Sequence, residues 1–207
     1  MSVDDWYLNI TVLPNLSKES VHYIGSLIPH DPSQWNLQTN AMKKYKKELL
    51  EKLVDIQENR CVYCGLGFDR KSVDREHFVH KEATRGFKEF MFTPENLFAS
   101  CEFCNRRLKK RTTVIDSYDK NYSDCTFKII HPYLDTPSEF ISFFPSNDVP
   151  YVVKPTEKDC GKGERTIEMF ELDTISMWKL RQAHLSCMAM DESEYAEILK
   201  YKGSFSE

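Results

Sequence analysis

Between residues 41 and 58 the hydrophobic positions recur at spacings of three and four, with lysines in the positions between them. This period is typical of an amphipathic helix that packs one face on a core. The recurring positions are Met42, Tyr45, Leu49, Leu53 and Ile56. Residues 1–40 contain three prolines and scattered aromatics without a clean period, so we expect an irregular arm with short elements.

The pattern after this helix predicts several short strands and helices. We expect an extended segment at 72–80, a turn and short helix at 94–100, a helix at 104–111, strands at 125–130, 140–144 and 151–153, and helices over 166–190. Asp173-Thr174 suits an N-cap that interrupts the last stretch. We find no internal repeat and no low-complexity linker. The pattern therefore predicts one continuous α+β chain, with an arm at 1–40, a core at 41–111 and an α+β elaboration at 112–207.

Composition narrows the class of protein. The 207 residues are 41% hydrophobic and 13% aromatic, which is typical of a folded globular chain. No apolar run approaches the roughly 18 residues of a membrane helix, and the first 30 residues lack a secretory signal. We therefore expect a cytoplasmic protein with no membrane partner. In a reducing cytosol its seven cysteines are better interpreted as metal ligands or free thiols than as disulfides.

Positive charge is concentrated in one part of the chain. From Arg60 to Arg111 there are twelve Lys and Arg against seven Asp and Glu, a local +5, although the whole chain carries −4. The charge peaks in 105–111, which has five cations in seven residues. Such a run can meet several phosphates at once, and the alternative is a solvated helix face.

Two cysteine pairs have the spacing of a zinc site. Cys61 and Cys64 form one pair, Cys101 and Cys104 form the other, and 36 residues separate the two pairs. Four thiolates complete a tetrahedral zinc site and leave no open position, so such a zinc is structural. The alternatives are free buried thiols or a redox pair. The other cysteines, at positions 125, 160 and 187, have no partner at ligand spacing and are interpreted as buried thiols.

A second pattern lies between and beside these pairs. Glu76-His77 is followed after 19 residues by Asn96, and Asn105 comes nine residues later, directly after the second cysteine pair. This order resembles the HNH endonucleases of the ββα-metal superfamily, in the form whose last histidine is an asparagine. The resemblance implies a ββα-metal core with a structural four-cysteine zinc site, flanked by helices and short strands.

The resemblance also implies roles for these residues. His77 would deprotonate the attacking water, a suitable task for an imidazole, and Asn96 would hold the hairpin and orient His77. Glu76, where the family more often has Asp, would bind a catalytic Mg²⁺ or Mn²⁺ together with Asn105, because oxygen ligands suit these ions. Further expected nucleic-acid contacts are His80, Arg85, Arg106 and Lys109.

A closer resemblance is to the HNH nuclease subunit of bacterial Septu antiphage defence systems, which also occurs as a retron effector. It extends over about 50–190, through the stretches 53–57, 76–78, 132–137 and 163–168, although His80 stands where these relatives usually have proline. It implies an ATPase partner of the ABC or SMC-like kind and, in a retron, a reverse transcriptase with its RNA–DNA product. Residues 112–207 are the expected docking region.

Two other functions stay open at this point. A non-catalytic zinc-ribbon module that binds nucleic acid would need only the four cysteines and the basic run. A standalone restriction-like HNH enzyme would share the catalytic residues, but we see no sequence-reading element such as a helix-turn-helix. The residues do not distinguish a DNA substrate from an RNA substrate, because the expected chemistry acts on the phosphate.

Overall fold

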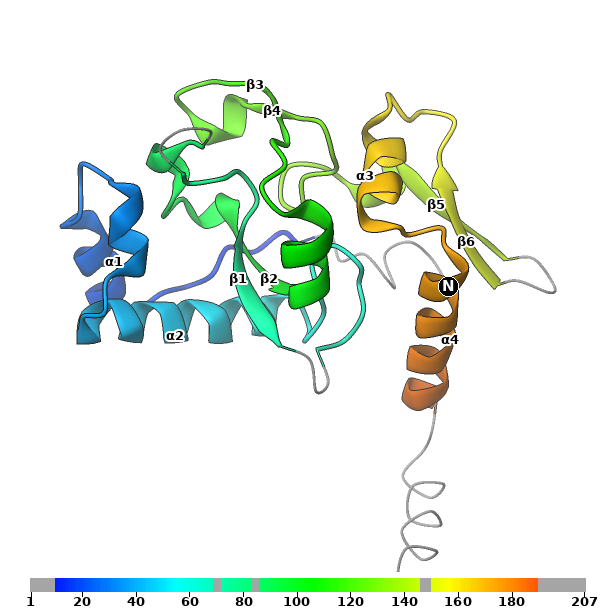
Figure 1. Cartoon of the computed structure of the whole chain (residues 1–207), viewed down its shortest axis with the longest axis horizontal. Helices are drawn as coiled ribbons and strands as arrows, with labels where there is room; N and C mark the ends of the chain where they lie inside the picture. The colour runs from blue at the N-terminus through cyan, green and yellow to red at the C-terminus, as the bar shows by residue number, and fades with distance from the viewer. Residues whose placement is uncertain (1–9, 69–71, 83–85, 146–149, 190–207) are drawn as a thin grey trace, which may run out of the picture.

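The helix α2, Asn40–Ile56, runs along the lower left of the view in Figure 1 and packs against the strands β1 and β2. The computed structural model describes residues 10–68, 72–82, 86–145 and 150–189. Thr39 caps α2 by accepting the Met42 amide, and the predicted apolar face is buried except at Ile56, which is partly buried. After the helix, Gln57 is buried and its side chain bonds both the amide and the carbonyl of Ala99. The helix end is thereby fixed to β2.

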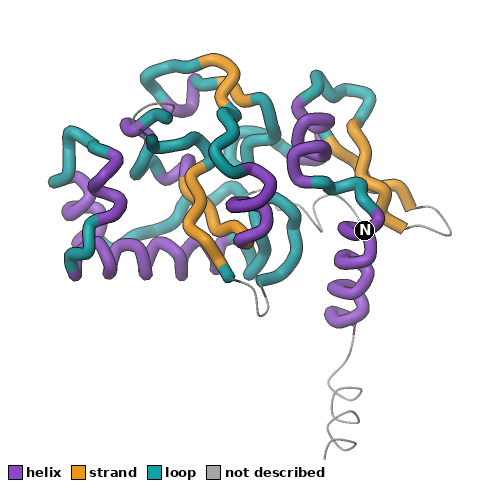
Figure 2. The backbone as a smooth tube through the Cα atoms, in the orientation of Figure 1, coloured by secondary structure: helices purple, strands orange, loops and turns teal. Residues whose placement is uncertain are grey.

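The central hairpin consists of β1, Val73–His77, and β2, Leu97–Cys101, and a helical segment η4, Phe103–Lys109, follows it (Figure 2). The strands are antiparallel, with His77 opposite Leu97 and Val73 opposite Cys101. The expected strand–strand–helix order is therefore present. The predicted short helix at 94–100 is wrong in its second half, because only Pro94–Asn96 is a helical turn (η3). A short, fully buried apolar strand has no period that distinguishes it from a helix.

Short hairpins and two helices are found in the described residues of the C-terminal part. β3, Ile115–Ser117, pairs with β4, Thr126–Phe127, so the strand predicted at 125–130 is much shorter than expected. The helical turn η5, Tyr122–Asp124, lies between these two strands. The turn η6, Pro137–Glu139, precedes the next hairpin.

The second C-terminal hairpin confirms the remaining predicted strands. It pairs β5, Ile141–Pro145, with β6, Pro150–Pro155. The helices α3, Lys162–Phe170, and α4, Ile175–Ala189, are separated where the sequence predicted an N-cap. Thr174 accepts the Met177 amide there, at 3.2 Å.

The described part of the N-terminal arm, residues 10–40, packs on the core. It contains α1, Lys18–Gly25, and η1, Pro32–Asn36. Glu48 of α2 accepts hydrogen bonds from Ser17 and Ser20, which fixes α1 on α2. Trp35 is buried and its ring contacts those of Tyr45 and Phe92. The arm therefore closes one side of the core.

The C-terminal part also packs on the core. Tyr63, between the first two zinc-type cysteines, stacks on Phe170 of α3 with ring centres 4.2 Å apart. The buried hydrophobic residues form one continuous cluster that includes residues of the arm, the hairpin and α3. None of the described helices combines the length and the apolar character needed to span a membrane.

Candidate active site

The four predicted zinc ligands lie together. Cys61 and Cys64 belong to a turn in which Gly65, with φ of 71°, donates its amide to the Cys61 carbonyl. Cys101 ends β2 and Cys104 lies in the first turn of η4. All four are buried, and their sulfur atoms lie within 4.8 Å of one another. This spacing and donor set fit a structural zinc ion, whose bonds to thiolates are about 2.3 Å long.

The three other cysteines lie apart from this cluster. Cys125 is buried, as predicted. Cys160 is exposed, so its interpretation as a buried thiol is wrong. It lies in the turn before α3, where the chain is on the surface. The side chain of Cys187 is outside the described residues.

His77 is held at the end of β1 in a defined protonation state. Its Nε2 lies 3.1 Å from the carbonyl oxygen of Met91. A carbonyl can only accept a hydrogen bond, so Nε2 carries the proton and Nδ1 carries the free electron pair. Burial holds the pKa of His77 well below its ordinary value, which keeps the ring neutral. The ring lies in a T-shaped arrangement with that of Trp35, with ring centres 4.3 Å apart.

Asn96 braces the segments on either side of His77. It is fully buried, its side-chain oxygen accepts the Val79 amide at 2.6 Å, and its side-chain nitrogen donates to the carbonyls of Val79 and Phe90. Val79 lies two residues after His77, and Phe90 precedes the residue that bonds the imidazole. This is the place expected for a residue that fixes the hairpin geometry.

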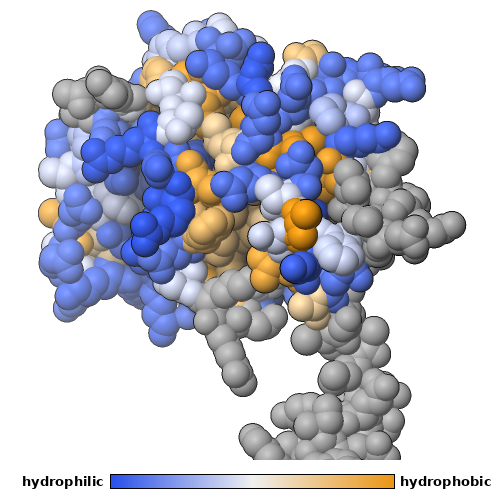
Figure 3. Space-filling view, turned by 45° about the vertical axis from the view of Figure 1, so that its right-hand side comes forward, coloured by the Kyte–Doolittle hydropathy of each residue, from blue (hydrophilic) through white to orange (hydrophobic). Residues whose placement is uncertain are grey.

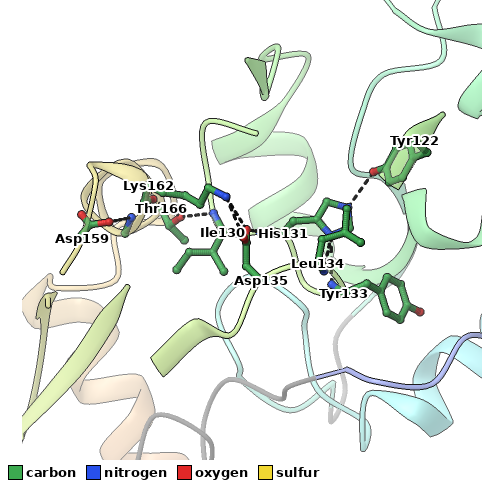
Figure 4. Close-up of polar contacts among 10 residues, drawn as sticks. Tyr122, Ile130, His131, Tyr133, Leu134, Asp135, Asp159, Lys162 and Thr166 are labelled. Atoms are coloured by element: carbon green, nitrogen blue, oxygen red, sulfur yellow. Dashed lines mark hydrogen bonds and ion pairs between the residues drawn. The ribbon is translucent and has the colours of Figure 1, made fainter. Parts of the chain in front are cut away.

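A hydrogen-bond chain extends from Asn96 into the C-terminal part. Tyr122 donates to the Asn96 side-chain oxygen at 3.1 Å and lies 2.9 Å from Nε2 of His131. The His131 Nδ1 accepts the amides of Tyr133 and Leu134, so Nε2 is its protonated nitrogen and donates to Tyr122. Figure 4 shows this histidine between Tyr122 and the turn that follows it.

The same turn is fixed to α3. Lys162 contacts both carboxylate oxygens of Asp135 at 2.9 Å, and Asp135 accepts the His131 amide at 2.7 Å (Figure 4). Thr166 of α3 accepts the Ile130 amide at 2.9 Å. The position of Asn96 therefore depends on contacts that reach as far as α3.

Glu76 has a different partner from the one predicted. Its carboxylate is buried, lies 2.5 Å from the Lys109 ammonium and accepts a hydrogen bond from the Tyr63 hydroxyl at 3.0 Å. Lys109 is itself fully buried and also donates to the His77 carbonyl. In this arrangement the Lys109 ammonium points into the protein and pairs with Glu76, so its predicted contact with phosphate stays untested.

Asn105 also faces a different residue. Its side-chain nitrogen donates to Asp74 at 3.0 Å, and Arg106 binds both oxygens of the same carboxylate at 2.7 and 2.8 Å. In this arrangement Glu76 and Asn105 do not fit the predicted role of joint ligands to one divalent cation. Glu76 already forms a neutral buried pair with Lys109, and a second cation beside that ammonium would be repelled.

Of the other predicted nucleic-acid contacts, Arg106 is paired with carboxylates, His80 is half-buried and Arg85 lies outside the described residues. Arg106 has an exposed side chain, but its guanidinium is shared between Asp74 and Glu102. His80 is half-buried, and burial lowers its pKa to about 4. Arg85 is outside the described residues.

Sequence reasoning missed several residues of this site. Trp35 covers His77 from a region that shows no regular pattern, and Met91 contributes only a backbone carbonyl. Neither leaves a signal in the sequence. Lys109 was predicted as a surface contact, and its burial on the same short helix as Asn105 was not predicted from the run of cations around it.

An apolar hollow lies next to the cysteine cluster, between η4 and α4. It has a volume of about 420 Å³, and its lining includes Phe103, Met177 and Leu180. Phe103 and Leu180 are 53% and 49% exposed. Hydrophobic residues gather in the middle of the face drawn in Figure 3. This hollow is separate from His77, because its lining contains neither that residue nor its neighbours.

Comparison with known proteins gives no assignment: no model of a known protein family matches the chain, and no curated protein sequence matches it.

Proposed function

We propose that this chain is an endonuclease that hydrolyses phosphodiester bonds in DNA or RNA, with His77 as the general base. The observation that carries the proposal is the hydrogen bond from His77 Nε2 to the Met91 carbonyl, which leaves Nδ1 as the acceptor for a proton from water. Burial keeps the imidazole neutral and so ready to accept that proton. The order of strand, strand and helix around a four-cysteine cluster supports the same proposal.

The charge that develops on the phosphate needs a positive partner. A bound Mg²⁺ or Mn²⁺ would supply it, as the HNH resemblance implies. Glu76 and Asn105 do not converge on one ion in this structure, so we assign no step to a metal at these residues. Dependence of cleavage on added Mg²⁺ or Mn²⁺ stays a prediction. It is tested by adding each ion to protein treated with a chelator.

Cleavage of labelled DNA and RNA by the purified full chain tests the proposal. We expect His77→Ala to reduce the rate by about 100-fold or more, because general-base catalysis contributes about that much. His22→Ala, at an exposed position on α1, is the matched control and should cut at the parental rate. Zinc content and melting temperature are measured for both variants. Parental activity in well-folded His77→Ala would place the chemistry at other residues.

The resemblance to Septu nuclease subunits adds a partner protein to the proposal. We propose that an ABC or SMC-like ATPase controls the nuclease, together with a reverse transcriptase and its RNA–DNA product in a retron. Co-expression with such an ATPase, followed by size-exclusion chromatography, tests the association. Full nuclease activity by a monomer that never co-elutes with the ATPase would instead support a standalone enzyme.

One observation favours a second function, the non-catalytic zinc module that binds nucleic acid. The buried pair of Glu76 with Lys109 takes up a residue that the catalytic proposal assigns to an ion. Cleavage of bound nucleic acid distinguishes the two functions. Binding of nucleic acid without cleavage, under every metal condition and with the partner present, would support the module.

A further inference from the structure

Two ammonium groups and the His77 ring share one aromatic neighbour. Lys46 of α2 and Lys81, which follows β1, place their Nζ atoms 4.9 and 5.7 Å from the centre of the Trp35 ring. These are distances at which a cation is attracted by the face of an indole. The same indole lies 4.3 Å from His77, centre to centre. Trp35 therefore holds two positive charges near the proposed base.

Arg75 of β1 adds a third positive charge. Its guanidinium donates to the backbone carbonyl of Lys46 at 3.3 Å, which fixes it against α2. Burial, and then the charges of Arg75 and Lys81, lower the pKa of Lys46. The three charges are therefore close enough to repel one another. We call Lys46, Arg75 and Lys81 the cation cluster.

The cation cluster lacks a matching anion. Glu76 and Glu82 attract Lys81, but these carboxylates form ion pairs with Lys109 and Arg111. Among the described residues, no carboxylate lies within ion-pair distance of any member of the cation cluster. All three members are half-buried, so their charges are partly desolvated while still in reach of solvent.

This contrasts with the cations that the sequence singled out. Arg106 is held by two carboxylates and Lys109 is buried against a third. Those side chains are already neutralised by the protein. Partly buried cations without a carboxylate partner are better placed to bind an external anion, because their charge is less screened and less compensated.

We propose that the cation cluster binds phosphates of a nucleic-acid backbone and so holds the strand beside His77. This binding proposal rests on the proposed nuclease function only for the step after binding, which is cleavage of the bound strand. Three cations, one on α2 and two on the stretch that includes β1, suit a chain of phosphates better than one small anion. Trp35 is only 8% exposed, so it does not offer a face to a base, and recognition by the cluster is independent of sequence.

Binding of fluorescein-labelled DNA and RNA oligonucleotides to the full chain tests this. The protein carries His77→Ala so that the strand is not cut, and anisotropy is measured over a range of salt concentrations. We expect Lys46→Gln and Lys81→Gln each to weaken binding by about fivefold to tenfold at about 0.1 M salt, and to reduce the salt slope by about 0.7–0.9. Lys47→Gln, which removes an equal charge from an exposed ion pair on α2, should change neither.

Other outcomes would overturn the inference. If the Lys46 and Lys81 variants bind like Lys47→Gln, the cluster does not contact the strand, even if the parental protein cleaves nucleic acid. Lys46→Arg keeps the charge and should retain binding, so loss of binding in Lys46→Arg as well would indicate a packing role. Tighter binding of polyglutamate than of the oligonucleotides, lost in Lys46→Gln, would assign the cluster to an acidic protein. Cluster-dependent binding, together with no cleavage by the chain that retains His77 under every metal condition and with the partner present, would support the cluster and reject the nuclease.

Discussion

The Lys109 ammonium lies 2.5 Å from the Glu76 carboxylate, and both side chains are buried in the centre of the candidate site. The strand β1 and the helix η4 are thereby linked by a pair of opposite charges. Whatever binds at Glu76 has to compete with this ammonium.

Removal of one partner from this pair should destabilise the fold. We expect Glu76→Gln to lower the free energy of unfolding by about 3 kcal/mol, because it leaves the buried Lys109 charge uncompensated. The double variant Glu76→Gln with Lys109→Met should lose much less than the sum of the two single losses. Urea denaturation measures all three. Glu51→Gln, which breaks the exposed pair with Lys47, should cost about 0.5 kcal/mol or less.

Zinc should be present in about one equivalent per chain and should be needed for folding. The four sulfurs are within 4.8 Å of one another and link the segment before β1 to the start of η4. We expect a strong chelator or Cys101→Ser to remove the metal and lower the melting temperature sharply. Cys160→Ser is the control, since that cysteine is exposed. A well-folded chain without zinc would show that the cluster is a set of free thiols.

Stability should fall in acid because His131 is buried in its neutral form. Burial, and then the charge of Lys162, lower the pKa of His131 to about 3. Between the unfolded value near 6.5 and this value, only the unfolded chain takes up the proton. The free energy of unfolding should therefore fall with decreasing pH over this range, by about 1.4 kcal/mol per pH unit for such a histidine.

His131→Asn should reduce this pH dependence, and the exposed His22→Ala should leave it unchanged. Protonation of His131 would also place a proton on the nitrogen that accepts two backbone amides. Chemical denaturation at a series of pH values measures the slope. An equal slope in parent and His131→Asn would mean that other groups, such as His77 and His80, account for it.

Trp35 should set both the stability and the proton affinity of the site. We expect Trp35→Ala to cost about 3–5 kcal/mol in unfolding free energy, because a large buried side chain is lost. It should also raise the pKa of His77 toward the ordinary value, since the indole shields that ring from water. The acid limb of the cleavage profile should then move to higher pH. Trp178→Ala, which removes an indole from α4, should leave the His77 pKa unchanged.

The fold could be predicted where periodicity and spacing are strong. The spacing of hydrophobic residues predicted which face of α2 is buried, and Asp173-Thr174 predicted the break between α3 and α4. The spacing of the four cysteines predicted that they lie together. The strand Leu97–Cys101 could not be distinguished from a helix, because all five of its residues are buried and no alternation marks it. The spacing of hydrophobic residues does not distinguish a strand from a helix where every residue is buried.

The sequence pattern predicted which residues to compare in the candidate site, but it did not predict the partners that they have in the structure. His77 and Asn96 lie near one another as the motif indicates. The packing of η4 against β1 determines that Asn105 contacts Asp74 and that Lys109 pairs with Glu76. Local sequence patterns do not predict this packing. A charged residue reads as exposed in sequence unless its partner is known, and here the partner is 33 positions away.

The contact between Trp35 and His77 joins parts of the chain that the motif keeps separate. A fragment that starts at residue 41 would contain every motif residue and the zinc cysteines, yet it would lose the indole that shields the imidazole. Transfer of the motif alone to another scaffold would therefore transfer an imidazole without the indole that contributes to its lowered pKa. A segment that keeps this environment of His77 is therefore larger than the motif, and it has to begin before residue 35.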